Sequence, residues 1–183
     1  MVESLWSRGA ARARAACGAL VVVVLGFNLQ HSFHGAELAR VRKDEALAQD
    51  AILIAQRLAE EFPGATVAAN NVGVLSYVSA RPVLDMLGLT DRHLAKVPDK
   101  PLGFPAHESH DGAYVLDRAP DLIFYGVPLA YPGRVSRDQV LAVGYASARD
   151  LRADPRFARD YRFDQLDLLD GRFAPVFRRR PSP

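Results

Sequence analysis

The sequence is poor in cysteine and in lysine. Of its 183 residues only Cys17 is a cysteine, which excludes a disulfide-bonded scaffold and a cysteine-ligated zinc site. Only three of the 23 basic residues are lysines, and arginines gather near the two ends of the chain, so no basic stripe runs through the middle. Nucleic-acid-binding proteins carry such a stripe, so we expect no nucleic-acid partner.

Three catalytic or cofactor motifs are also missing. The sequence contains no Gly-x-Gly-x-x-Gly fingerprint, no phosphate-cradling Gly-Lys-Ser/Thr loop and no Gly-x-Ser-x-Gly nucleophile elbow. We therefore expect no bound cofactor. Hydrophobic residues nevertheless make up 49% of the chain, which is enough for a packed domain.

An apolar run stands near the amino terminus. Residues 15–29 contain one polar residue, Asn28, and follow Arg8, Arg12 and Arg14. A spanning helix needs about 17–20 apolar residues, so the run is marginal unless it extends to Phe33 or back to Ala10. A retained membrane anchor, a cleaved signal peptide and a soluble core helix are the alternatives, and we favour the anchor. Because arginines collect on the cytoplasmic side, residues 1–34 are expected to form a cytoplasmic terminus and a single span of the inner (cytoplasmic) membrane. The rest of the chain is then extracytoplasmic.

The pattern after this run predicts an α/β domain over residues 35–180, with a tail at 181–183. Apolar residues at helical spacing predict a long amphipathic helix over 36–62, which Pro63-Gly64 ends. Short apolar strands are expected at 66–69, 81–85 and 121–125, with helices at 72–77, 91–96 and 112–118. We expect loops at 97–106 and 126–140 and mixed structure at 147–159. A hairpin at 161–168 and 173–177 turns at Asp170-Gly171, and Pro175 marks its second strand as an edge. The fold class is therefore α/β, with a small, mostly parallel sheet, flanking helices and a C-terminal β-hairpin.

Polar residues follow two of the expected strands. Asn70 and Asn71 come after the first strand, where a ligand or simply a tight turn is possible. Asp85 ends the second strand, where a carboxylate needs a partner, for which Arg81 is a candidate. Asp91 either faces the same crevice or caps the next helix.

The densest polar cluster is residues 107–111, His-Glu-Ser-His-Asp. His107 and His110 are three residues apart and could share one helical face and bind a metal. Their spacing differs from the four-residue His-Glu-x-x-His zinc motif, and loop polarity or hydrogen bonding to a substrate explains the cluster as well. We assign no metal ligand.

The order of several short motifs resembles a known family. These are Val83-Leu84-Asp85-Met86-Leu87-Gly88-Leu89-Thr90-Asp91, then His93, then His107-Glu108, then Asp111 to Leu116, then Arg118-Ala119-Pro120-Asp121. In this order they resemble the C-terminal extracytoplasmic region of bacterial polytopic GT-C glycosyltransferases that use polyprenyl-phosphate sugars, of the mannosyl- and arabinofuranosyltransferase type. The resemblance covers about residues 60–180. It implies a tail module without the membrane catalytic core, so no catalytic residue is carried over.

Three functions follow from these observations. The first is a membrane-anchored module that binds a glycan or a polyprenyl-phosphate sugar, or assists a polytopic membrane glycosyltransferase. Its candidate binding residues carry amide, carboxylate and imidazole groups: Asn70, Asn71, Asp85, Asp91, His107, Glu108 and Asp111. The second is a small metal-dependent hydrolase or transferase that uses His107, Glu108, His110 and Asp111. The third is a structural protein that docks a partner.

Overall fold

The computed structural model describes residues 2–32, 35–97, 109–142 and 145–181. The chain forms two units, residues 1–46 and 47–183. The first contains helix α1 (Val2–Ser32) and the beginning of helix α2 (Gly35–Glu61). Within α1, the 18 residues Ala13–Gln30 have a mean hydropathy of 1.6 and none of them is buried.

This stretch is long and apolar enough to span a membrane. The apolar side chains of this stretch are exposed, with Leu20 at 64% and Val22 at 69%. Within its apolar part, Asn28 donates a side-chain hydrogen bond to the Val24 carbonyl oxygen over 2.8 Å, so this amide donor is satisfied inside the helix.

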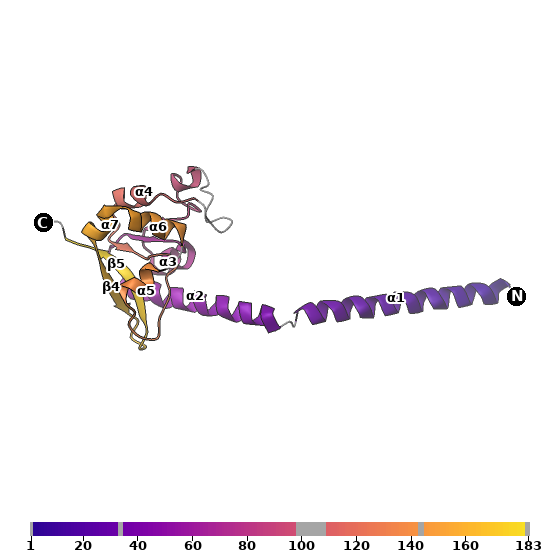
Figure 1. Ribbon diagram of the computed structural model, residues 1–183. Coiled ribbons are helices and arrows are strands. Elements are labelled where there is room, and N and C mark those ends of the chain that lie inside the picture. The colour runs from indigo at the N-terminus through magenta and orange to yellow at the C-terminus, as the bar shows by residue number, and fades with distance from the viewer. Residues whose placement is uncertain (1, 33–34, 98–108, 143–144, 182–183) are drawn as a thin grey trace. The chain divides into compact units, whose positions relative to one another are not determined.

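The second unit is built on a five-stranded mixed sheet with strand order β2-β1-β3-β5-β4. Figure 1 shows its last two strands, β4 and β5, side by side. Strands β1 (Val67–Ala69), β2 (Val83–Asp85) and β3 (Leu122–Ile123) are parallel. Strands β4 (Tyr161–Asp167) and β5 (Phe173–Arg179) form an antiparallel hairpin. The predicted α/β class and the C-terminal hairpin are confirmed.

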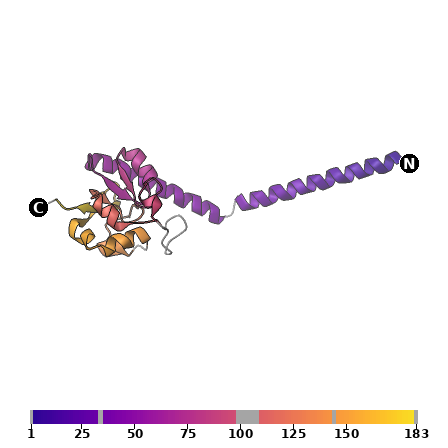
Figure 2. The same cartoon turned by 90° about the horizontal axis from the view of Figure 1, so that it is seen from above.

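Helices cover both faces of this sheet. They are α3 (Val72–Ser79), α4 (Gly112–Asp117), α5 (Arg137–Leu141), α6 (Ala146–Ala153) and α7 (Pro155–Asp160), with a 3-10 turn η1 (Leu94–Lys96). One core cluster joins α2 and α3 to the sheet through Ile54, Leu58 and Leu75. The other joins α4 to α7 to the opposite face, and Figure 2 shows the violet and orange helices on separate sides of the strands.

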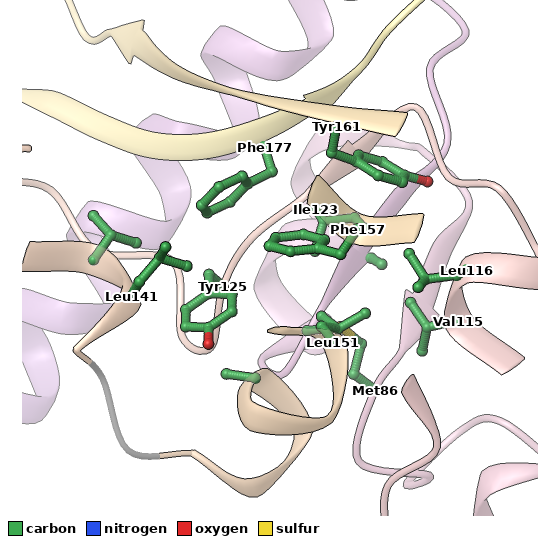
Figure 3. Packing of buried hydrophobic residues seen from close by; sticks show 13 residues of the cluster. Met86, Val115, Leu116, Ile123, Tyr125, Leu141, Leu151, Phe157, Tyr161 and Phe177 are labelled. Carbon is green, nitrogen blue, oxygen red and sulfur yellow. The ribbon is translucent and has the colours of Figure 1, made fainter. Parts of the chain in front are cut away.

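Aromatic rings fill the second cluster (Figure 3). The Phe157 ring lies 4.7 Å from that of Phe177 and 5.9 Å from those of Tyr125 and Tyr161, between ring centroids. Such contacts add stability beyond the apolar area they bury. The cluster fixes α7 against the hairpin.

The prediction that Pro175 marks an edge strand is wrong, because β5 lies between β3 and β4. In an antiparallel strand, alternate N–H groups point to the same neighbour. On the side away from β4, Phe173 donates to the Tyr131 carbonyl and Arg179 to the Asp121 carbonyl. Strand β3 pairs only with Arg178 and Phe177. On this side of β5, Pro175 lies between Phe173, which pairs with Tyr131, and Phe177, which pairs with β3. Within the part of the chain that the structure describes, no backbone acceptor faces Pro175 there, so the N–H group that proline lacks is not needed.

Two other expectations are also corrected. Residues 126–140 are not all loop, since α5 begins at Arg137 behind a capping box in which Ser136 and Gln139 bond each other's backbone N–H. The segment 147–159 consists of two helices, separated at Asp154, whose carboxylate caps α7 ahead of Pro155. The expected loop at 98–106 lies outside the described residues.

Candidate functional site

The carboxyl ends of β1, β2 and β3 form the edge where a ligand is expected. The chain leaves β1 for β2 through α3 on one face and returns to β3 through α4 on the other. Neighbouring loops diverge at such a point in a parallel sheet. Ala69 pairs with Asp85, so Asn70 and Asp85 lie at the same edge, as the sequence predicts.

Asn70 connects this edge of the sheet to α6 and to the segment after β3. Its side chain is 3% exposed, and its Oδ1 accepts a 3.1 Å hydrogen bond from the Ser147 hydroxyl on α6. Its backbone N–H donates to the Gly126 carbonyl after β3. In the described part of the chain, Nδ2 has no partner. Asn71 is exposed at the start of α3, and its side chain makes no capping hydrogen bond.

Asp85 is 1% exposed and satisfied by the turn that follows it. Its Oδ1 accepts from the Leu87 N–H at 2.9 Å, and its Oδ2 accepts from the N–H and hydroxyl of Thr90 at 2.5 and 3.2 Å. Arg81 is not its partner, because that guanidinium donates to the Ala59 carbonyl of α2 at 2.9 Å. Asp85 therefore holds a turn, and its burial keeps it from presenting an oxygen to solvent.

Four side chains from two segments form a linked polar cluster that we name the DHDY cluster: Asp91, His93, Asp111 and Tyr114. The Tyr114 hydroxyl donates to Asp91 Oδ2 over 3.0 Å, and His93 Nε2 lies 3.1 Å from Asp111 Oδ2. The imidazole of His93 stacks on the Tyr114 ring, with 4.0 Å between centroids and 16° between planes. These contacts connect the segment before η1 to the start of α4.

Backbone caps hold the two aspartates in place. Asp91 Oδ1 accepts from the N–H groups of His93 and Leu94 at 2.9 and 3.0 Å. Asp111 Oδ1 accepts from the Tyr114 N–H at 3.0 Å and so caps α4. The predicted helix over 91–96 is only the 3-10 turn η1, with His93 as its N-cap residue, but Asp91 does accept from the N–H groups at its start. Each carboxylate also presents its second oxygen to the cluster.

The DHDY cluster is accessible to solvent. The side chain of His93 is 49% exposed and that of Asp111 is 32% exposed. Burial, followed by the hydrogen bond to Asp91 and the charge of that carboxylate, raises the pKa of Tyr114 above its ordinary value. Tyr114 therefore stays a neutral hydrogen-bond donor at physiological pH, beside carboxylate acceptors and a stacked ring pair.

Of the predicted binding residues, the structure brings Asp91 and Asp111 together, while Asn70 and Asp85 are used within the fold. His107 and Glu108 lie outside the described residues. The sequence interpretation omitted His93 and Tyr114 from the site, although both stand in the motifs that carry the family resemblance. Their pairing is a tertiary contact between residues 21 positions apart, which helical or strand spacing does not reveal.

His110 is 5% exposed and its Nδ1 lies 2.5 Å from Asp150 Oδ2 on α6. This contact fastens the start of α4 to α6. Among the described residues no three histidine, cysteine or acidic side chains form a group that could hold a metal ion. Since His107 and Glu108 are not described, the metal-dependent alternative stays a prediction.

The sequence model of the family described as Domain of unknown function (DUF8728) matches residues 38–169. The chain belongs to the DUF8728 family. No curated protein and no solved structure matches the chain. The DUF8728 match begins within α2 and ends at Leu169, just after β4, so it includes the whole DHDY cluster.

Proposed function

We propose that the chain is a membrane-anchored module whose α/β domain binds a glycan, either free or as the sugar of a polyprenyl-phosphate sugar. The observation that carries this proposal is the DHDY cluster, which combines a stacked ring pair, with His93 exposed and Tyr114 half-buried, with carboxylate oxygens and a neutral hydroxyl donor. Sugars offer the matching chemistry, because their hydroxyls donate and accept hydrogen bonds and their C–H faces pack on rings.

The resemblance to the C-terminal region of GT-C glycosyltransferases supports the same ligand class. It also supports a polytopic membrane glycosyltransferase as a partner, with binding rather than transfer as the role of this chain. Helix α1 supplies a stretch able to span the inner membrane. The arginines that precede this stretch favour a cytoplasmic amino terminus and an extracytoplasmic domain.

Calorimetric titration of the full chain in detergent, with mannose and arabinofuranose oligosaccharides and with polyprenyl-phosphate mannose, tests the proposal. The variants His93→Ala and Tyr114→Phe keep both backbone caps but remove the ring pair or the hydroxyl. Each is expected to weaken binding about tenfold, since one lost hydrogen bond to a charged group corresponds to roughly that factor.

Tyr77→Phe is the matched control, because Tyr77 is 89% exposed on α3 and lies outside the cluster. Its affinity should equal that of the unmodified chain. If no probe binds the unmodified chain, or if Tyr77→Phe weakens binding as much as Tyr114→Phe, the DHDY cluster is not a glycan site.

A further inference from the structure

A second surface, at the opposite end of the sheet, has chemistry of a different kind. A groove of about 750 Å³ lies where α2 ends, bordered by Phe62 to Ala65, the starts of β3 and β4 and the end of β5. From this geometry we infer that the groove binds a phosphate group through Arg162, Arg178 and Arg180. The inference is independent of the proposed glycan site.

The three arginines share one face of the hairpin. Arg162 on β4 pairs directly with Arg178 on β5, so their side chains leave the sheet on the same side. Arg180 is two residues beyond Arg178 and continues that face. It is the face that α2 covers farther along, because Val176 and Leu166 pack there against Leu58. Since α2 ends at Glu61 and the chain turns at Gly64, with φ +81°, the helix does not extend over the three arginines, and all three are exposed.

Both carboxylates that border the groove are already paired. Glu61 accepts a 3.1 Å hydrogen bond from Arg57. Asp121 accepts from Arg179 Nη2 at 2.9 Å and from the N–H and hydroxyl of Thr66, both at 2.9 Å. These bonds together outweigh the effect of burial, which is the largest single influence and acts upward, and lower the pKa of Asp121. The negative charge of Asp121 is therefore paired with Arg179 and does not neutralise the other arginines of the groove.

The other three arginines are left without a counter-charge. Within the described ranges no ion pair joins Arg162, Arg178 or Arg180 to a carboxylate, and the Arg178 guanidinium lies over the Phe62 ring, 5.2 Å from its centroid. Like charges placed directly opposite on neighbouring strands destabilise a sheet. An anion bound between Arg162 and Arg178 would replace the repulsion between the two guanidinium groups with two attractive interactions.

The number and arrangement of the guanidinium groups suit a phosphate ligand. The planar fork of arginine donates two parallel hydrogen bonds to a phosphate or carboxylate, and several forks around one concave surface suit the three free oxygens of a phosphate monoester. The phosphate could belong to a lipid headgroup or to a soluble molecule. Both sources offer the same group to the groove.

The test uses the full chain in phosphatidylcholine nanodiscs, titrated calorimetrically with inorganic phosphate and with dihexanoyl phosphatidic acid. Arg178→Gln is expected to weaken binding of both probes about tenfold, because it removes one charge-assisted fork. The matched control is Arg137→Gln, which removes an exposed arginine on α5, away from the groove, and should change affinity less than about twofold, as expected for distant surface charges in salt. Equal affinity for the two probes supports recognition of the phosphate alone, and tighter binding of the lipid supports a headgroup.

Thermal stability gives a second readout. Without phosphate, Arg162→Gln should unfold at the same temperature as the unmodified chain or higher, because it removes the repulsion across β4 and β5. The inference is overturned if neither probe binds, if Arg137→Gln and Arg178→Gln weaken binding equally, or if polyglutamate displaces phosphate, which would indicate an acidic protein partner. A lower unfolding temperature for Arg162→Gln would also overturn it, since the arginine would then be structural.

Discussion

Replacing Asp85 with alanine separates a structural role from a ligand-binding role for this carboxylate. Asp85 is 1% exposed, and its carboxylate takes three hydrogen bonds from the turn after β2. Two of the donors are the backbone N–H groups of Leu87 and Thr90. In Asp85→Ala the two N–H groups lose their carboxylate acceptor, and the turn loses the hydrogen bonds that hold it together.

The magnitude follows from the two backbone bonds. A hydrogen bond to a charged group contributes about 1.5–3 kcal/mol. Leu87 is buried and loses that contribution fully, whereas water can reach the exposed Thr90. We therefore expect Asp85→Ala to lower the free energy of unfolding by about 3 kcal/mol. At about 2–4 °C per kcal/mol for a domain of this size, the midpoint temperature should fall by roughly 6–12 °C.

Near-ultraviolet circular dichroism of the tyrosines, recorded on the full chain in detergent, is a suitable assay because the one tryptophan, Trp6, precedes the α/β domain. Thr90→Val is the control, since it removes only the 3.2 Å hydroxyl bond and should cost less than about 1 kcal/mol. An unchanged midpoint for Asp85→Ala would refute the reasoning. So would an equal loss for the two variants.

Three further predictions concern helix packing and pH. Gly112→Ala should cost about 1–3 kcal/mol in a urea titration, because the new Cβ would stand 2.7–2.9 Å from atoms of α6, whereas Gly73→Ala in α3 meets nothing within 4 Å and should be neutral or stabilising. His110→Ala should cost about 1–3 kcal/mol by the same titration, since it removes the bond to α6, and an unchanged unfolding midpoint would contradict that role. Burial raises the pKa of Tyr161 to about 12, and its hydroxyl donates to the Pro120 carbonyl over 2.8 Å. Because the folded state favours the neutral phenol, this stability is complete below the ordinary pKa of 10.0 and is lost as the pH rises through about 12, so Tyr161→Phe should flatten the alkaline part of the unfolding curve.

Periodicity and turn chemistry predicted most of the elements of the fold. The pattern of residues 36–62 gave a helix within one residue of each observed end, because Pro63-Gly64 stops it clearly. The short helix α5 was missed, although Ser136 and Gln139 form a capping box that the sequence displays. The strand that contains Pro175 was wrongly predicted to be an edge strand, because strand order depends on long-range pairing. Proline excludes only the one inter-strand hydrogen bond that its own N–H would donate.

The candidate site was harder to predict than the fold. A polar residue at the end of a predicted strand correctly marks the carboxyl edge of the sheet: Asp85 ends β2, and Asn70 follows β1 at the same edge. Whether such a group faces a ligand depends on which donors the next turn and a distant helix present. The Asp85 carboxylate accepts hydrogen bonds from Thr90, five residues away, and Asn70 Oδ1 accepts one from Ser147 on α6, 77 residues later. Neither partner follows from local spacing.

Hydrogen exchange of the full chain in nanodiscs, with and without polyprenyl-phosphate mannose, shows whether the DHDY cluster holds the sugar. We expect slower exchange of the His93, Leu94 and Tyr114 amides, because they donate to the two aspartates of the DHDY cluster and opening them would disrupt a bound sugar. Unchanged exchange at these three amides under saturating ligand, with protection confined to other segments, would contradict this expectation.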